Sequence, residues 1–131
     1  MHDRGVDPHD LDALGVRVVA GADDVAAGNE AINEVRVTDE IVGYIMALAD
    51  ETRTSPSLVL GVSPRGSAML LRTSKAAAWL AGRDFVTPDD VKALLGPTWG
   101  HRLILRPEVE LEGGTSDSIL AGLADRIPVP G

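Results

Sequence analysis

The stretch Gly61-Val62-Ser63-Pro64-Arg65 is the most informative part of this sequence. Pro64 has a fixed φ that suits the first turn of a helix, and Ser63 before it is a favoured N-cap. Together they predict a helix over about residues 64–81. Arg65 then lies in the first turn, where backbone N–H groups lack helical partners and the guanidinium can reach beyond the helix end. Such a helix N-terminus can bind an anion, and phosphate is the natural one.

Three further blocks of sequence surround this stretch. Thr52-Arg53 precedes it, and two blocks follow it: Gly82-Arg83-Asp84-Phe85-Val86-Thr87-Pro88-Asp89-Asp90-Val91 and His101-Arg102-Leu103-Ile104-Leu105. In this order and spacing, the four blocks closely resemble the C-terminal lid of the MoxR family of AAA+ ATPases. The resemblance covers about residues 5–113, and Pro128-Val129-Pro130 is similar to the family's C-terminus.

The resemblance implies a role for Arg65 as the lid arginine called sensor 2, which reaches the phosphates of ATP. It makes Ser63 and Pro64 part of the same nucleotide-binding turn, and Tyr44 a further candidate for contact with adenine. For the intact protein it implies ATP and Mg²⁺ bound mainly by a separate AAA+ core, and a homo-oligomeric ring that we expect to be a hexamer. The implied activity is chaperone-like maturation of protein complexes.

The nucleotide-binding elements of an ATPase core are missing from the sequence. There is no Gly-x-x-x-x-Gly-Lys-Ser/Thr phosphate loop, and neither of the two lysines, Lys75 and Lys92, follows a glycine. No apolar strand ends in paired acids that could hold Mg²⁺. We therefore expect the core to lie upstream of Met1, and this chain to hydrolyse no ATP alone.

Composition agrees with one small domain. At 131 residues and 44% hydrophobic content, the chain can bury a core of its own. No apolar stretch approaches the length of a membrane span, and the first residues lack the apolar region of a signal peptide. The absence of cysteine excludes disulfides and thiol catalysis and is compatible with the cytoplasm, which is the expected location.

Charge is distributed unevenly along the chain. The formal net charge is −8, yet residues 53–106 carry eight of the 12 lysines and arginines. The acidic total argues against a nucleic-acid surface, which needs many phosphate contacts. A local basic segment fits one small polyanion better than a nucleic acid, although for every arginine except Arg65 neutralisation by neighbouring acids is an equally good explanation.

Capping residues and apolar spacing predict the other helices. The expected helical spans are 23–35, with Val25, Ile32 and Val35 on its apolar side, 38 to about 53, 64–81, 87 to the break at Gly96-Pro97, and 116 or 117 to 124. One or two further turns would carry Trp99 up to His101. Extended pieces are expected at 58–62, 85–86, 102–105 and 109–111.

The predicted fold is mainly α: a small helical bundle of four main helices and a short C-terminal helix, with minor extended links. We expect residues 1–20 to be a linker from the core, residues 21–113 to be the helical lid, and residues 114–131 to be a C-terminal helix and tail.

Other candidate residues have simpler structural interpretations. His101 could contact phosphate, but a lone histidine in a bundle is more often structural. Tyr44 is more often a half-buried core aromatic than an adenine contact, and we expect Trp79 and Trp99 to pack the bundle. With no cysteine and no paired histidine spacing, a metal site has no support.

Two other functions can be compared with the lid. A free-standing helical interaction module would need an exposed apolar stripe, and the helix near 117–124 is the only candidate. A helix-turn-helix DNA-binding module would need a polar, basic recognition helix, whereas the helix at 64–81 is too apolar.

Overall fold

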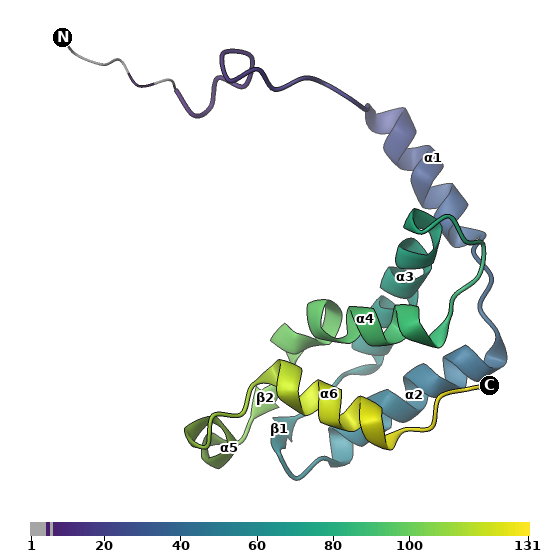
Figure 1. Cartoon of the computed structure of the whole chain (residues 1–131), viewed down its shortest axis with the longest axis vertical. Helices are drawn as coiled ribbons and strands as arrows, with labels where there is room; N and C mark the ends of the chain where they lie inside the picture. Colours follow the sequence, from purple (N-terminus) through teal and green to yellow (C-terminus); the bar gives the residue numbers. More distant parts are fainter. Residues whose placement is uncertain (1–4, 6) are drawn as a thin grey trace. The chain divides into compact units, whose positions relative to one another are not determined.

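The computed structural model describes residue 5 and residues 7–131. The described residues divide into two compact units, with the boundary after Glu30. The elements, drawn in Figure 1, are α1 (Ala22–Asn33), α2 (Asp39–Thr54), β1 (Leu58–Leu60), α3 (Pro64–Leu80), α4 (Pro88–Trp99), the 3-10 turn η1 (Gly100–Arg102), β2 (Ile104–Leu105), α5 (Pro107–Leu111) and α6 (Ser116–Arg126). The mainly helical fold expected from the sequence is confirmed.

The first unit contains most of α1, which begins next to Asp23 and Asp24 as predicted. Acidic side chains in the first turn are favourable against the helix dipole. None of the residues of α1 is buried, and Val25 is 62% exposed. The helix ends at Asn33 rather than Val35, because Arg36 already pairs with Phe85 in a parallel β-bridge.

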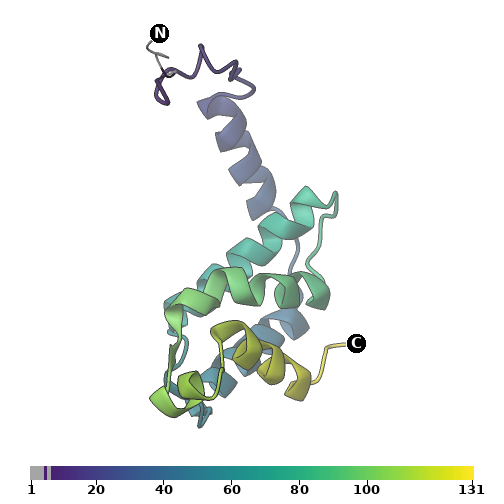
Figure 2. The same ribbon diagram turned by 60° about the vertical axis from the view of Figure 1, so that its left-hand side comes forward.

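The second unit is a bundle in which α3 and α4 lie side by side, as both views show (Figures 1 and 2). Helices α2 and α6 pack against them, so the C-terminal helix belongs to the same bundle. The largest fully buried side chains in the centre are Leu48, Thr52, Val62, Leu70, Ser74, Val91, Trp99 and Leu123. This core draws on every long helix of the unit, which fixes the ends of α2, α3 and α4 relative to one another.

A short antiparallel pair of strands closes one end of the bundle. Leu58 pairs with Leu105 and Leu60 with Ile104, with an irregularity between the two pairs. The pairing joins the segment before α3 to the segment after α4. The extended pieces predicted near 58–62 and 102–105 are therefore confirmed in part, since residues 100–102 form η1 instead.

The predicted break at Gly96-Pro97 is wrong, because α4 continues through Pro97 to Trp99. Proline lacks the N–H of a regular helical turn and normally bends or ends a helix. Here Thr98 and Trp99 are buried, and the Trp99 indole bonds to α3, so tertiary packing outweighs the local preference.

Two smaller expectations are also wrong. Residues 109–111 belong to α5, a helix that starts at Pro107, because proline is as well suited to a first helical turn as to an extended segment. Trp79 is 40% exposed, whereas Trp99 is fully buried as expected. Gly82, predicted as the C-cap of α3, lies one residue beyond the C-cap Ala81 and has a φ of 80°, which favours glycine.

Candidate functional site

The three residues predicted for the nucleotide-binding turn lie together at the start of α3. Ser63 is the N-cap, and its hydroxyl accepts a hydrogen bond from the Gly66 amide at 3.2 Å. Pro64 occupies the first turn, and Arg65 follows it with an exposed side chain. That side chain forms no ion pair with another residue that the structure describes. The turn therefore presents an unpaired positive charge at a helix N-terminus.

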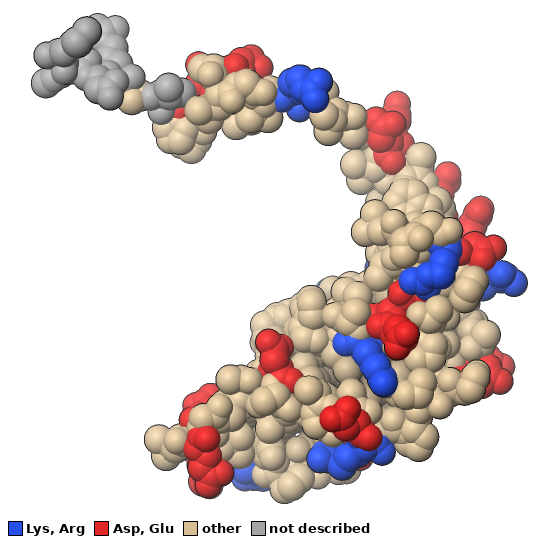
Figure 3. Space-filling model, in the orientation of Figure 1, with Lys and Arg blue, Asp and Glu red and all other residues tan. Residues whose placement is uncertain are grey.

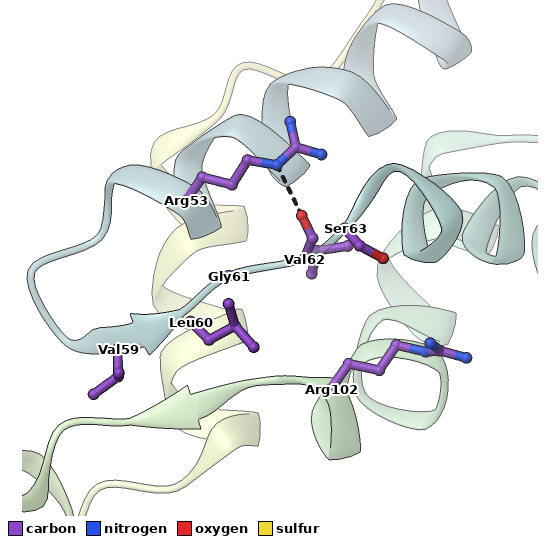
Figure 4. Close-up of a pocket in the computed structure, with 7 residues that line it drawn as sticks. All are labelled: Arg53, Val59, Leu60, Gly61, Val62, Ser63 and Arg102. Atoms are coloured by element: carbon purple, nitrogen blue, oxygen red, sulfur yellow. Dashed lines mark hydrogen bonds between the residues drawn. The ribbon is translucent and has the colours of Figure 1, made fainter.

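Thr52 and Arg53, at the end of α2, hold the segment that leads into this turn. The Thr52 hydroxyl accepts a hydrogen bond from the Val62 amide at 2.9 Å, and Arg53 Nε donates to the Val62 carbonyl at 2.8 Å (Figure 4). A side chain at Gly61 could not fit, because a Cβ there would lie 2.6 Å from the Thr52 carbonyl carbon. Both backbone groups of Val62 are thus fixed to α2.

The other side of the turn is held from the end of α4. The Trp99 indole N–H donates to the Gly66 carbonyl at 2.8 Å, and Trp99 has no exposed surface. A Cβ at Gly66 would come within 2.6 Å of a Val62 methyl group and 3.7 Å of Arg102 Cδ. The aliphatic part of Arg102 therefore runs beneath the first turn of α3.

A pocket of about 600 Å³ opens beside this turn. Arg53 and Arg102 lie on opposite sides of the pocket. In Figure 4 both arginine side chains extend in the same direction as the side chain of Ser63. The other lining residues are Val59, Leu60, Gly61 and Val62. None of the lining residues is acidic, so the pocket carries positive charge and can accept an anion.

The sequence did not identify Arg53, Trp99 or Arg102 as site residues. The pairs Thr52-Arg53 and His101-Arg102 were visible as blocks, but their spacing cannot reveal that they meet at one turn. Thr52 and Arg53 bond to the backbone of Val62, and no sequence pattern marks a backbone partner. His101 itself is exposed and does not line the pocket.

Tyr44, the remaining predicted contact, lies in the core on α2 and is 3% exposed. Its hydroxyl has no hydrogen-bond partner among the described residues, and it does not line the pocket. Burial raises the pKa of the phenol, and the charge of Asp89 raises it further. Contact with adenine stays a prediction, and the buried ring contributes first to the core.

The block from Gly82 to Val91 builds the start of α4 and does not line the pocket beside α3. Arg83 holds Asp90 with two hydrogen bonds of 2.6 Å, and Asp90 also accepts from the Thr87 amide at 2.8 Å. The bonds from Arg83 lower the pKa of Asp90 below its usual value although burial opposes the shift, and the Thr87 amide contributes less. This ion pair fixes the start of α4.

Charge elsewhere on the bundle is mixed. On the face shown in Figure 3, lysines and arginines alternate with acids along residues 31–131. Within the described part of the chain, no cluster of histidine and acidic side chains could hold a metal ion. No helix described in residues 5 and 7–131 combines the length and apolarity that a membrane crossing requires.

A known protein family and known proteins are similar to this chain in sequence. The model of the family described as AAA lid domain matches residues 50–123. YeaC, an uncharacterized protein of Bacillus subtilis, is 40% identical over 113 residues, covering 86% of this chain and 35% of YeaC. The protein MoxR of Paracoccus denitrificans is 43% identical over 74 residues, covering 53% of this chain and 21% of MoxR.

A solved structure supports the same relationship. It is a protein of Cytophaga hutchinsonii classed provisionally as an ATPase, with a TM-score of 0.73 and 28% identity over 78% of this chain and 34% of its own. This chain therefore spans about a fifth to a third of the length of the relatives it matches.

Proposed function

This chain belongs to the AAA lid domain family and is a lid of the kind found in MoxR-type AAA+ ATPases, and from that premise we propose that it closes over ATP bound by a separate core. Arg65 acts as sensor 2 and contacts the terminal phosphate. Ser63 and Pro64 hold the turn from which Arg65 projects. The core supplies the phosphate loop and the Mg²⁺ ligands, so this chain alone does not hydrolyse ATP.

The observation that carries the proposal is the position of Arg65. A positive charge in the first turn of a helix is unfavourable against the helix dipole, by a few tenths of a kcal/mol or more. Arg65 is exposed and has no acidic partner among the described residues that would offset this cost. An anion outside this chain would offset it, and a phosphate would meet both the guanidinium and the helix N-terminus.

The mechanism follows from this geometry. During phosphoryl transfer, negative charge shifts among the oxygens around the terminal phosphate. An arginine held by a fixed turn stabilises that charge without reorganising. Thr52, Arg53 and Trp99 fix the turn through the backbone of Val62 and Gly66. Rotation of the lid as a rigid body would therefore carry Arg65 toward or away from the nucleotide.

For the intact protein we propose a homo-oligomeric ring, expected to be a hexamer, that uses ATP and Mg²⁺. Its activity would be chaperone-like maturation of protein complexes. The name MoxR among the relatives and their greater length support this proposal.

The alternative of a free-standing interaction module has weaker support. Its candidate stripe on α6 includes Leu120 and Leu123, which are 3% and 1% exposed. Both side chains are used within the bundle, where α6 packs against α2 and α4. The stripe is therefore not available to a partner while the bundle is folded.

The test is the turnover of the intact ATPase that carries changes in this domain. Arg65→Ala should raise the barrier to hydrolysis by about 2–4 kcal/mol, as for loss of other preorganised charge contacts. Arg65→Lys should restore only part of the rate, because a point charge lacks the planar fork of arginine. Arg72→Ala, which removes an exposed arginine two turns further along α3, is the control and should matter less.

A rate for Arg65→Ala within about twofold of the parent, with earlier thermal unfolding, would contradict the sensor 2 assignment, since a twofold change corresponds to well under 1 kcal/mol in the barrier.

A further inference from the structure

We propose that Arg102 is a second phosphate-binding arginine of this domain, and that the pocket between Arg53 and Arg102 holds a phosphate group next to the one that Arg65 contacts. The inference deepens the proposed function, since it places a second contact on the same phosphate chain. The ligand class is the oxyanion of a polyphosphate, as in a nucleoside triphosphate.

The first argument is the state of the Arg102 guanidinium. Its Nε is fully buried and has no hydrogen-bond partner among the described residues. Three other buried side-chain atoms share this condition, Tyr44 Oη, Ser67 Oγ and Ser74 Oγ, but all three belong to neutral hydroxyls. An unpaired charged group costs far more to bury than a hydroxyl. Arg102 as a whole is only half-buried, and its terminal guanidinium nitrogens have no hydrogen-bond partner among the described residues, so an anion that they bind would offset this cost.

The second argument is that Arg102 is built into position. Its stem passes beneath Gly66, and Trp99, three residues earlier, is bonded to the Gly66 carbonyl. A side chain at position 66 would collide with Val62, and its Cβ would lie in van der Waals contact with Arg102 Cδ. The guanidinium is therefore held near the start of α3 by the same contacts that hold the Ser63-Pro64-Arg65 turn.

The third argument is the charge of the pocket. Arg53 forms the opposite wall of the pocket. It forms an ion pair with Asp50, whose side chain is 68% exposed and does not line the pocket. No acidic residue lines the pocket itself. With a volume of about 600 Å³, the pocket has more than enough room for a phosphate group. Arg102 without an ion pair, beside Arg53 whose charge is shared with Asp50, favours an oxyanion over a neutral ligand.

The experiment is a titration of this chain with inorganic tripolyphosphate without Mg²⁺, followed by NMR of backbone amides and arginine Nε–H groups. The parent should show a saturable shift of Arg102 Nε–H together with the amides of Val62 and Ser63. Arg102→Met keeps an unbranched stem beneath Gly66 but removes the charge. Its affinity should fall about tenfold, the usual effect of losing one charged hydrogen bond.

Two further variants separate charge from packing. Arg102→Lys should recover part of the affinity. Lys92→Met removes one positive charge from an exposed position of α4 outside the pocket, and it should bind within about twofold of the parent, a difference well below that of one hydrogen bond. The readout on Arg102 Nε–H in the parent needs no variant, so it decides the question even if Arg102→Met folds poorly.

Several outcomes would overturn the inference: no saturable shift in the parent, equal affinity for Arg102→Met, or a response to ATP without a response to tripolyphosphate. The last would assign the pocket to the base. Failure here leaves the role of Arg65 standing. Conversely, if Arg65→Ala does not slow the intact ATPase, sensor 2 is wrong whatever Arg102 binds.

Discussion

The starts of α3 and α4 are similar in sequence but have different roles in the molecule. Each has a hydroxyl N-cap followed by proline and charged residues: Ser63-Pro64-Arg65 in one and Thr87-Pro88-Asp89-Asp90 in the other. In each cap the hydroxyl accepts from the amide three residues later, at 3.2 Å and 3.3 Å, but only α4 adds the reciprocal bond from the Thr87 amide to Asp90.

The charges differ in sign and in what they bind. The acids of α4 agree with the helix dipole, and Asp90 is 7% exposed and paired with Arg83. The arginine of α3 opposes the dipole and has no partner among the described residues. Stability therefore accounts for the start of α4 and leaves Arg65 unexplained. A charge that costs stability and forms no ion pair with a described residue indicates a ligand outside the chain.

The largest expected effect on stability comes from changing Trp99, the residue that joins α3 and α4. Trp99→Ala should lower the free energy of unfolding by about 3–5 kcal/mol, because it empties a fully buried site and removes the bond to Gly66. Urea unfolding followed by circular dichroism measures it. Trp99→Phe, which removes the hydrogen bond but keeps most of the packing, should cost clearly less, and equal costs would contradict this account of the site.

The next effect tests the start of α4. Asp90→Ala should destabilise the bundle by on the order of 2 kcal/mol, through loss of a helix cap and of charged hydrogen bonds. Asp89→Ala is the matched control, because Asp89 is exposed and makes no such bonds. In the intact ATPase, turnover per folded molecule should stay near that of the parent for both. A loss of turnover in Asp90→Ala but not in Asp89→Ala would contradict a purely structural role for the start of α4.

The same ion pair predicts a dependence on pH. The folded-state pKa of Asp90 lies below its unfolded value of about 3.9, first because of the hydrogen bonds from Arg83. A lowered pKa stabilises the fold fully above about pH 4, and this contribution is lost as the pH falls through the folded-state pKa. The stability gap between the parent and Asp90→Asn should therefore narrow on acidification below about pH 4. If the stability difference between the two proteins stayed constant with pH, the charge of Asp90 would not be the source of its contribution to stability.

The sequence predicted the starts of α3 and α4 because their N-caps and prolines act locally. The glycine at 82 acts locally in the same way at the end of α3. The sequence could not predict that α4 continues beyond Pro97, since the reason is the burial of Trp99 against α3. The helix at 107–111 was missed because a proline suits a helix start and an extended segment equally well.

The candidate site was predictable only in part. Ser63, Pro64 and Arg65 are adjacent in the sequence, and a local rule brings them together. Arg53 and Arg102 lie 49 positions apart, and the pairing of β1 with β2 and the packing of α3 on α4 bring them to one pocket. Neither arginine is explained by capping or spacing.

The central claim is that Arg65 serves a ligand and not the fold. Its most direct test is urea unfolding of this chain with the single change Arg65→Ala. The account predicts a free energy of unfolding within about 0.5 kcal/mol of the parent, as for surface positions without specific contacts. A loss above about 1.5 kcal/mol, the size expected for a residue that stabilises a capped helix, would contradict it.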